Sequence, residues 1–163
     1  NDTVPQALAL IPAEQRPQVI HQSGEKQIDA LRANYAAAGV EATLTPFIDD
    51  TAKAFAEADL VIGRAGASTV TEIAAVGAAA LFVPFPHAVD DHQTTNARFL
   101  VDAGGAWLVP QPEFTPTALA QRLQSLQRGQ LMDMAQKAQH MKKTDAVAAV
   151  VTACEQLAKV TTA

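Results

Sequence analysis

Short apolar segments alternate with helical patterns along most of this chain, and the alternation limits the possible folds more than any other feature. Five segments have the composition of strands: residues 18–22, 42–47, 59–63, 79–84 and 106–109. Strands joined through helices pair in parallel by right-handed crossovers, and the uninterrupted apolar run at 79–84 is typical of a strand buried on both faces. The sequence therefore predicts an α/β fold with a doubly wound parallel sheet.

Helical patterns occupy both ends of the chain. Residues 4–11 have the character of the remainder of a helix, before which we expect a strand. Apolar residues recur at helical spacing from Thr115-Pro116, an N-cap followed by proline, to the C-terminus. We expect residues 1–163 to form a single domain with a helical tail. Because the first residue is Asn1 rather than methionine, we expect this domain to be a fragment of a longer protein.

The composition argues against several classes of function. The chain has 163 residues, 48% of them hydrophobic, which suits one domain with a buried core. Its formal net charge of −5 argues against a nucleic-acid partner, which would need clustered lysine and arginine. No run of 18 apolar residues is present, which argues against a membrane span. We expect the single cysteine, Cys154, to be a small buried side chain in a reducing compartment.

A glycine-bearing junction at residues 63–72 is the first candidate for a binding site. It joins the strand at 59–63 to a helix expected over 69–76. Glycines let a ligand approach the backbone, and the unpaired N–H groups and dipole at the start of a helix favour phosphate. The junction has neither the lysine of a Walker loop nor the third glycine of a dinucleotide fingerprint. It therefore predicts a diphosphate site of another kind.

Two further loops are expected at the same edge of the sheet. Ligands of doubly wound sheets bind outside the carboxyl ends of the strands. Residues 47–50 and 84–93 each follow a predicted strand, so they emerge at this edge together with residues 63–69. The convergence of three polar or glycine-bearing loops strengthens the prediction of a binding site there.

The residues of these loops, in this order and spacing, are specific to one family. The motifs are Phe47-Ile48-Asp49-Asp50, Arg64-Ala65-Gly66-Ala67-Ser68-Thr69-Val70-Thr71-Glu72, and Pro84-Phe85-Pro86-His87 followed by Asp91-His92-Gln93. Through them, nearly the whole chain resembles the C-terminal half of the MurG family. These bacterial transferases move N-acetylglucosamine (GlcNAc) from UDP-GlcNAc to a lipid-linked muramoyl-pentapeptide, converting lipid I to lipid II in peptidoglycan synthesis.

The resemblance implies a GT-B glycosyltransferase whose C-terminal, Rossmann-like domain binds the UDP-GlcNAc donor without a metal or cofactor. It places a glycine-rich loop and the N-terminal acceptor domain before Asn1. We therefore expect this fragment to lack its general base and to be inactive alone. The resemblance also implies a peripheral enzyme at the cytoplasmic face of the bacterial inner membrane, where the missing N-terminal domain meets the lipid-linked acceptor.

The resemblance assigns most of the nucleotide contacts to two motifs. Ile48 matches the position whose backbone amide and carbonyl meet the uracil, and Glu72 matches the residue that accepts hydrogen bonds from the ribose hydroxyls. The residues that match the diphosphate loop and helix start are Ala67, Ser68, Thr69, Val70 and Thr71. A structural alternative exists for Glu72, because residues 69–72 also have the spacing of a capping box with Thr69 as the N-cap.

The third motif carries the predicted sugar contacts. Gln93 and His92 match a pair of glutamines that contact the sugar hydroxyls in the family. His92 departs from that pattern, and the loop is one residue longer, so the register between the two stays open. Arg64 and His87 could each touch a phosphate. We expect Arg64 instead to be a solvated or ion-paired side chain at a strand end, and His87 to be structural.

The sequence also permits other interpretations. The pairs Asp49-Asp50 and Asp90-Asp91 could suggest a metal, but capping and solvation explain both pairs, so we predict no metal site. One alternative function is a UDP-sugar-binding subunit of a split glycosyltransferase. Another is a UDP-GlcNAc epimerase-like domain, which would need acid-base carboxylates and histidines in its cleft. A dehydrogenase is disfavoured because the glycine fingerprint is missing.

Overall fold

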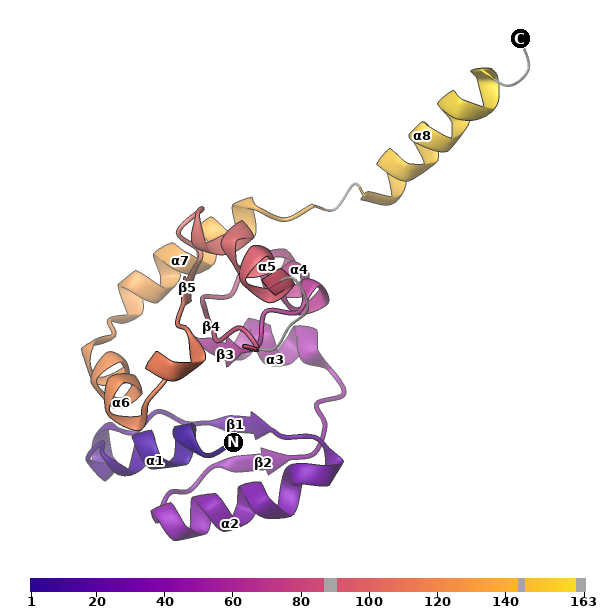
Figure 1. The fold of residues 1–163 in the computed structure, drawn as a ribbon. Helices are drawn as coiled ribbons and strands as arrows, with labels where there is room; N and C mark the ends of the chain where they lie inside the picture. Colours follow the sequence, from indigo (N-terminus) through magenta and orange to yellow (C-terminus); the bar gives the residue numbers. More distant parts are fainter. Residues whose placement is uncertain (87–90, 144–145, 161–163) are drawn as a thin grey trace.

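A computed structural model of the chain describes residues 1–86, 91–143 and 146–160, in which strands and helices alternate (Figure 1). The strands are β1 (Ile20–Gln22), β2 (Thr43–Thr45), β3 (Val61–Gly63), β4 (Ala80–Phe82) and β5 (Ala106–Leu108). The α-helices are α1 (Thr3–Ala9), α2 (Ile28–Ala38), α3 (Thr51–Glu57), α4 (Ala67–Val76), α5 (His92–Val101), α6 (Pro116–Ser125), α7 (Arg128–His140) and α8 (Ala146–Val160). Short 3-10 helices lie at Ala13–Gln15, Glu25–Gln27 and Gln111–Glu113.

All strand pairs are parallel, as predicted, but they form two sheets. One sheet has the order β1-β2, with Ile20 opposite Thr43, and the other has the order β3-β4-β5. Within the described ranges, no backbone pairing joins β1 to β3. Each of these two strands therefore has one edge without a neighbouring strand.

Two clusters of buried side chains lie on opposite sides of β3. Val61 packs against the cluster formed largely by α4, α5 and β4, whereas Ile62 packs against the cluster formed by α1, α2 and α6. Successive side chains of a strand point to opposite faces, so β3 contributes to both cores. This arrangement confirms the predicted doubly wound α/β architecture, and all three residues of β4 are buried.

The ends of several helices follow from their sequence. Gly39 and Gly77 adopt the left-handed conformation just after α2 and α4, with φ of 62° and 78°, where a side chain would add strain. The Asp50 carboxylate accepts a hydrogen bond from the Lys53 N–H and caps α3. Thr115 caps α6 by accepting from the Ala118 N–H, with Pro116 at the first helical position.

Two expectations about helices are wrong. Helix α4 begins at Ala67 with Gly66 as its N-cap, two residues before the predicted start at Thr69. Cys154 is exposed rather than buried, because α8 extends away from the body of the molecule (Figure 1). No helix that the structure describes is both long and apolar enough to cross a bilayer.

Candidate functional site

The junction after β3 presents the start of a ten-residue helix to solvent. The backbone turns at Gly66, whose lack of a side chain leaves the N-terminus of α4 uncapped by any side-chain hydrogen bond. The first N–H groups of a helix have no intrahelical acceptor, which here applies to Ala67, Ser68 and Thr69. The Asn96 side-chain amide of α5 donates to the Ala65 carbonyl at 3.1 Å and holds the turn in place. The junction can therefore offer several N–H donors to an anion.

Val70 and Thr71, which follow in α4, use their N–H or hydroxyl groups within the helix. The Val70 side chain is 3% exposed and its N–H donates to the Gly66 carbonyl at 3.0 Å, so Val70 serves the core and the helix. The Thr71 hydroxyl donates to the Ala67 carbonyl at 2.8 Å. The sequence prediction treated residues 67–71 as one set, whereas the N–H groups without an intrahelical acceptor are confined to Ala67–Thr69.

Glu72 is not a capping residue. Because α4 begins at Ala67, Thr69 lies inside the helix and cannot act as the N-cap that a capping box requires. Glu72 is exposed on the second turn of α4. Within the described ranges, its carboxylate makes no hydrogen bond or ion pair with another side chain. The structural alternative for Glu72 is therefore removed, and the carboxylate can accept hydrogen bonds from a ligand.

Side chains of β1 and β2 hold the backbone of the loop after β2 in place. The Ile48 N–H donates to the Gln22 side-chain oxygen at 2.9 Å, and the Thr45 hydroxyl donates to the Phe47 carbonyl at 2.6 Å. The amide that the sequence assigned to a nucleobase is thus occupied by Gln22 in this structure. Helix α3, which this loop leads into, packs against α4 and connects the loop to the junction after β3.

Arg64 is exposed, as expected for a solvated side chain at a strand end, but its guanidinium also makes hydrogen bonds within the chain. Its guanidinium donates to the carbonyls of Val83 and Pro84, both at 2.9 Å, and to the Gln111 side-chain oxygen at 2.7 Å. It also lies over the Phe85 ring, 5.4 Å from the centroid. No local pattern in the sequence predicts these contacts, because the partners lie 19 to 47 residues away along the chain.

The first turn of α5 contains both residues assigned to the sugar. Gln93 accepts a hydrogen bond from the Phe85 N–H at 2.9 Å, while His92 is exposed as the first residue of the helix. Asp91, just before them, has a φ of 50° and accepts a hydrogen bond from the Thr94 hydroxyl at 2.7 Å. His87 and Asp90 lie outside the described residues, and the register between His92 and Gln93 stays open.

Among the residues that the structure describes, the titratable groups with shifted pKa values lie in β1 and α2. Burial raises the pKa of Tyr35 to about 12. Burial, followed by the positive charge of the chain's amino group, lowers the pKa of His21, whose Nδ1 lies 3.0 Å from the Tyr35 hydroxyl. This pair is a packed structural contact. In the part of the chain that the structure describes, no three His, Cys, Asp or Glu side chains gather as metal ligands would.

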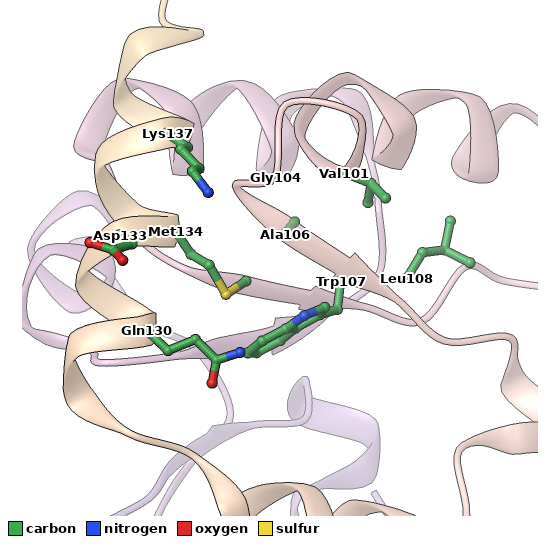
Figure 2. Close-up of a pocket in the computed structure, with 9 residues that line it drawn as sticks. All are labelled: Val101, Gly104, Ala106, Trp107, Leu108, Gln130, Asp133, Met134 and Lys137. Atoms are coloured by element: carbon green, nitrogen blue, oxygen red, sulfur yellow. The ribbon is translucent and has the colours of Figure 1, made fainter.

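A hollow of about 520 Å³ lies between β5 and α7. Figure 2 shows Gln130, Met134 and Lys137 of α7 facing Ala106 and Trp107 of β5. All three residues of β5 line the hollow, so it runs along the side of this strand, between β5 and α7. Ligands of parallel α/β sheets bind at the carboxyl end, and we therefore place the candidate site on the loops.

Known proteins with similar sequences share this architecture. Residues 1–150 match the family model for the glycosyltransferase family 28 C-terminal domain. The chain is 73% identical over 157 residues to the UDP-N-acetylglucosamine--N-acetylmuramyl-(pentapeptide) pyrophosphoryl-undecaprenol N-acetylglucosamine transferase of Paracidovorax citrulli (strain AAC00-1), covering 96% of this chain and 44% of that protein. The transferase of the same name from Polaromonas sp. is 69% identical, with 98% and 41% covered.

Solved structures agree with the sequence relatives. The crystal structure of Acinetobacter baumannii MurG matches with a TM-score of 0.85 and 44% identity over 94% of this chain and 46% of that one. The glycosyltransferase VinC in complex with DTDP matches with a TM-score of 0.66 at 19% identity, which bears on the fold alone. The chain spans less than half the length of these proteins. The predicted resemblance to the C-terminal half of MurG and the predicted Rossmann-like GT-B fold are confirmed, and the chain belongs to the glycosyltransferase family 28 C-terminal domain family.

Proposed function

We propose that this chain is the donor-binding domain of an inverting glycosyltransferase that moves GlcNAc from UDP-GlcNAc to a lipid-linked muramoyl-pentapeptide in cell-wall peptidoglycan synthesis. The observation that carries the proposal is the start of α4. Three N–H groups without intrahelical acceptors lie there, and the unpaired Glu72 carboxylate follows on the next turn. A nucleoside diphosphate needs hydrogen-bond donors around its phosphates and, beside them, an acceptor for its ribose hydroxyls. The N–H groups and the carboxylate follow each other in the same order along α4.

Each part of the donor has a counterpart in this proposal. The amides of Ala67, Ser68 and Thr69 hold the diphosphate, and Glu72 accepts from the ribose. The backbone of Ile48 reads the uracil, and Gln93, with or without His92, contacts the sugar.

In the reaction, an acceptor hydroxyl attacks the anomeric carbon of GlcNAc while the bond from that carbon to the UDP oxygen breaks. Negative charge develops on the leaving diphosphate. The amides at the start of α4 and the positive end of its dipole lower the energy of that charge, because they are already oriented before the reaction begins. The acceptor's proton must pass to a base, which we place outside this chain.

The proposal assigns the remaining functions to a second domain. The transferases that this chain resembles are more than twice its length. We propose that the acceptor site and the general base belong to that additional domain, and that a first strand and glycine-rich loop precede α1. We also propose that the whole protein works at the cytoplasmic face of the inner membrane as a peripheral enzyme. The present chain should therefore bind the donor without turning it over.

Calorimetry with the 163-residue chain tests the proposal. UDP and UDP-GlcNAc should bind, whereas NAD should not, and a transfer assay with lipid-linked acceptor should give no product from this chain alone. A longer protein that joins this chain to an acceptor domain provides the positive control for transfer. Binding of NAD in preference to UDP, or transfer by the chain by itself, would contradict the proposal.

A further inference from the structure

We propose that Arg64 is a positioning residue that fixes the orientation of Gln93, so that the Gln93 NH₂ group presents hydrogen-bond donors to the sugar of the donor. The contact of Gln93 with the sugar rests on the proposed function, whereas the effect of Arg64 on Gln93 is argued from contacts within the chain. These contacts run from Gln111 through Arg64 and one peptide group to Gln93.

Arg64 ties together the three loops that follow β3, β4 and β5. It stands in the first of these loops, donates to Val83 and Pro84 in the second, and donates to Gln111 in the third. The two carbonyl contacts come from one guanidinium nitrogen, each at 2.9 Å. A planar guanidinium has N–H groups on two terminal nitrogens in a fixed geometry, so it can reach the two carbonyls from one nitrogen and Gln111 from the other. The ammonium of lysine has three N–H groups on a single nitrogen and cannot reproduce this arrangement.

Arg64 and Gln93 hold opposite sides of the same peptide group. The Pro84 carbonyl accepts from Arg64, and the N–H of that same peptide, which belongs to Phe85, donates to Gln93 at 2.9 Å. A trans peptide is planar, and its C=O and N–H point in opposite directions; no described peptide bond is cis. Fixing the carbonyl therefore fixes the direction in which the N–H meets Gln93.

The contact also decides which end of the Gln93 amide faces the ligand. A backbone N–H is a donor, so the atom of Gln93 that it meets must be the side-chain oxygen. The NH₂ group is then directed away from Phe85, with two N–H donors. We infer that Gln93 recognises an oxygen acceptor on the sugar, such as a hydroxyl oxygen or the acetyl carbonyl.

A direct contact between Arg64 and the diphosphate would have a different signature. A phosphate contact depends mainly on charge, so lysine would retain much of it, and its loss would appear as weaker binding of UDP relative to uridine. A positioning role depends on the planar fork, so lysine would fail, and the loss would appear in UDP-GlcNAc relative to UDP. Comparing the three ligands separates the two roles.

The test uses Arg64→Lys and Arg64→Met, with Gln111→Ala to remove one contact while keeping the arginine. Arg16→Lys is the matched control, because Arg16 also holds two backbone carbonyls, those of Ile11 and Gly39, away from these loops. The first measurement is the exchange rate of the Phe85 amide hydrogen by NMR without nucleotide. We expect severalfold faster exchange in both Arg64 variants, a smaller increase in Gln111→Ala, and no change in Arg16→Lys.

The second measurement is the affinity for uridine, UDP and UDP-GlcNAc by calorimetry. Both Arg64 variants should lose about two- to tenfold in affinity for UDP-GlcNAc, the worth of one or two hydrogen bonds, while UDP binding stays unchanged. Unchanged exchange at Phe85, or a loss of UDP binding that lysine restores, would overturn the inference. If the unmodified chain bound no uridine nucleotide, the proposed function would fail, and the exchange rates would still decide whether Arg64 holds this peptide.

Discussion

Single residues at the carboxyl end of the sheet divide into those that hold the loops and those with groups left over for a ligand. The side chains of Arg64 and Asn96 donate hydrogen bonds to backbone carbonyls and so hold the loops of the site in place. Glu72 has a carboxylate with no partner in the described part of the chain. In our proposal, this carboxylate and the start of α4 are therefore available to the donor.

Replacing Glu72 by alanine should separate these roles. Because the carboxylate accepts from the ribose in our proposal, Glu72→Ala should lower UDP affinity about tenfold or more, as expected for hydrogen bonds to a charged group. The thermal unfolding midpoint should change little, because Glu72 takes no part in capping α4. Calorimetry and thermal unfolding give the two readouts, and Glu41→Ala, another exposed glutamate, is the control. Unchanged affinity with reduced stability would make Glu72 a structural residue.

At the scale of helices and strands, the sequence predicted the alternation of the described strands and α-helices, but not the three 3-10 helices or most of the particular contacts. Apolar periodicity and capping residues such as Asp50, Thr115 and Gly39 are local signals, so they identified the elements. The start of α4 was missed by two residues because Thr69 imitates an N-cap. The contacts of Arg64 and Gln22 depend on how distant loops meet, which no local pattern encodes.

A tight contact between Gly105, just before β5, and Ala138 of α7 gives a prediction about stability. A Cβ atom added to Gly105 would lie 2.8 Å from the backbone nitrogen of Ala138, so Gly105→Ala must push the helix away. We expect a loss of about 1–3 kcal/mol in the free energy of unfolding, as for other overpacked sites. Denaturant unfolding measures it. Gly129→Ala is the control, because nothing lies near that position in α7 and alanine favours a helix; equal stability of both variants would contradict the prediction.

The whole molecule has the outline of a six-stranded doubly wound sheet with its central place vacant. In such sheets the strand order is 3-2-1-4-5-6, and the observed orders β2-β1 and β3-β4-β5 correspond to the strands numbered 3-2 and 4-5-6. We propose that the strand expected before α1 would lie between β1 and β3. Ile20 of β1, 60% exposed here, is consistent with a missing neighbour.

We therefore predict that an added strand stabilises the domain. A chain extended before α1 by an apolar β-forming segment from a relative should unfold at higher denaturant concentration, and the backbone amides on the open edges of β1 and β3 should exchange more slowly. An extension of the same length made of glycine and serine is the control, since it cannot form a buried strand. If both extensions gave the same stability and exchange, the vacant place would not be a strand site.

The hydrogen bond between Gln22 and Ile48 also changes what base recognition can contribute. Because the Ile48 N–H already has an acceptor before any ligand arrives, a nucleobase that binds there replaces one hydrogen bond with another, and little affinity is gained. A base that offers a donor at that point would leave a polar group unsatisfied and be rejected. In the proposed donor site, the loop after β2 would thus determine which base is accepted, while the phosphate and ribose contacts would supply most of the binding energy.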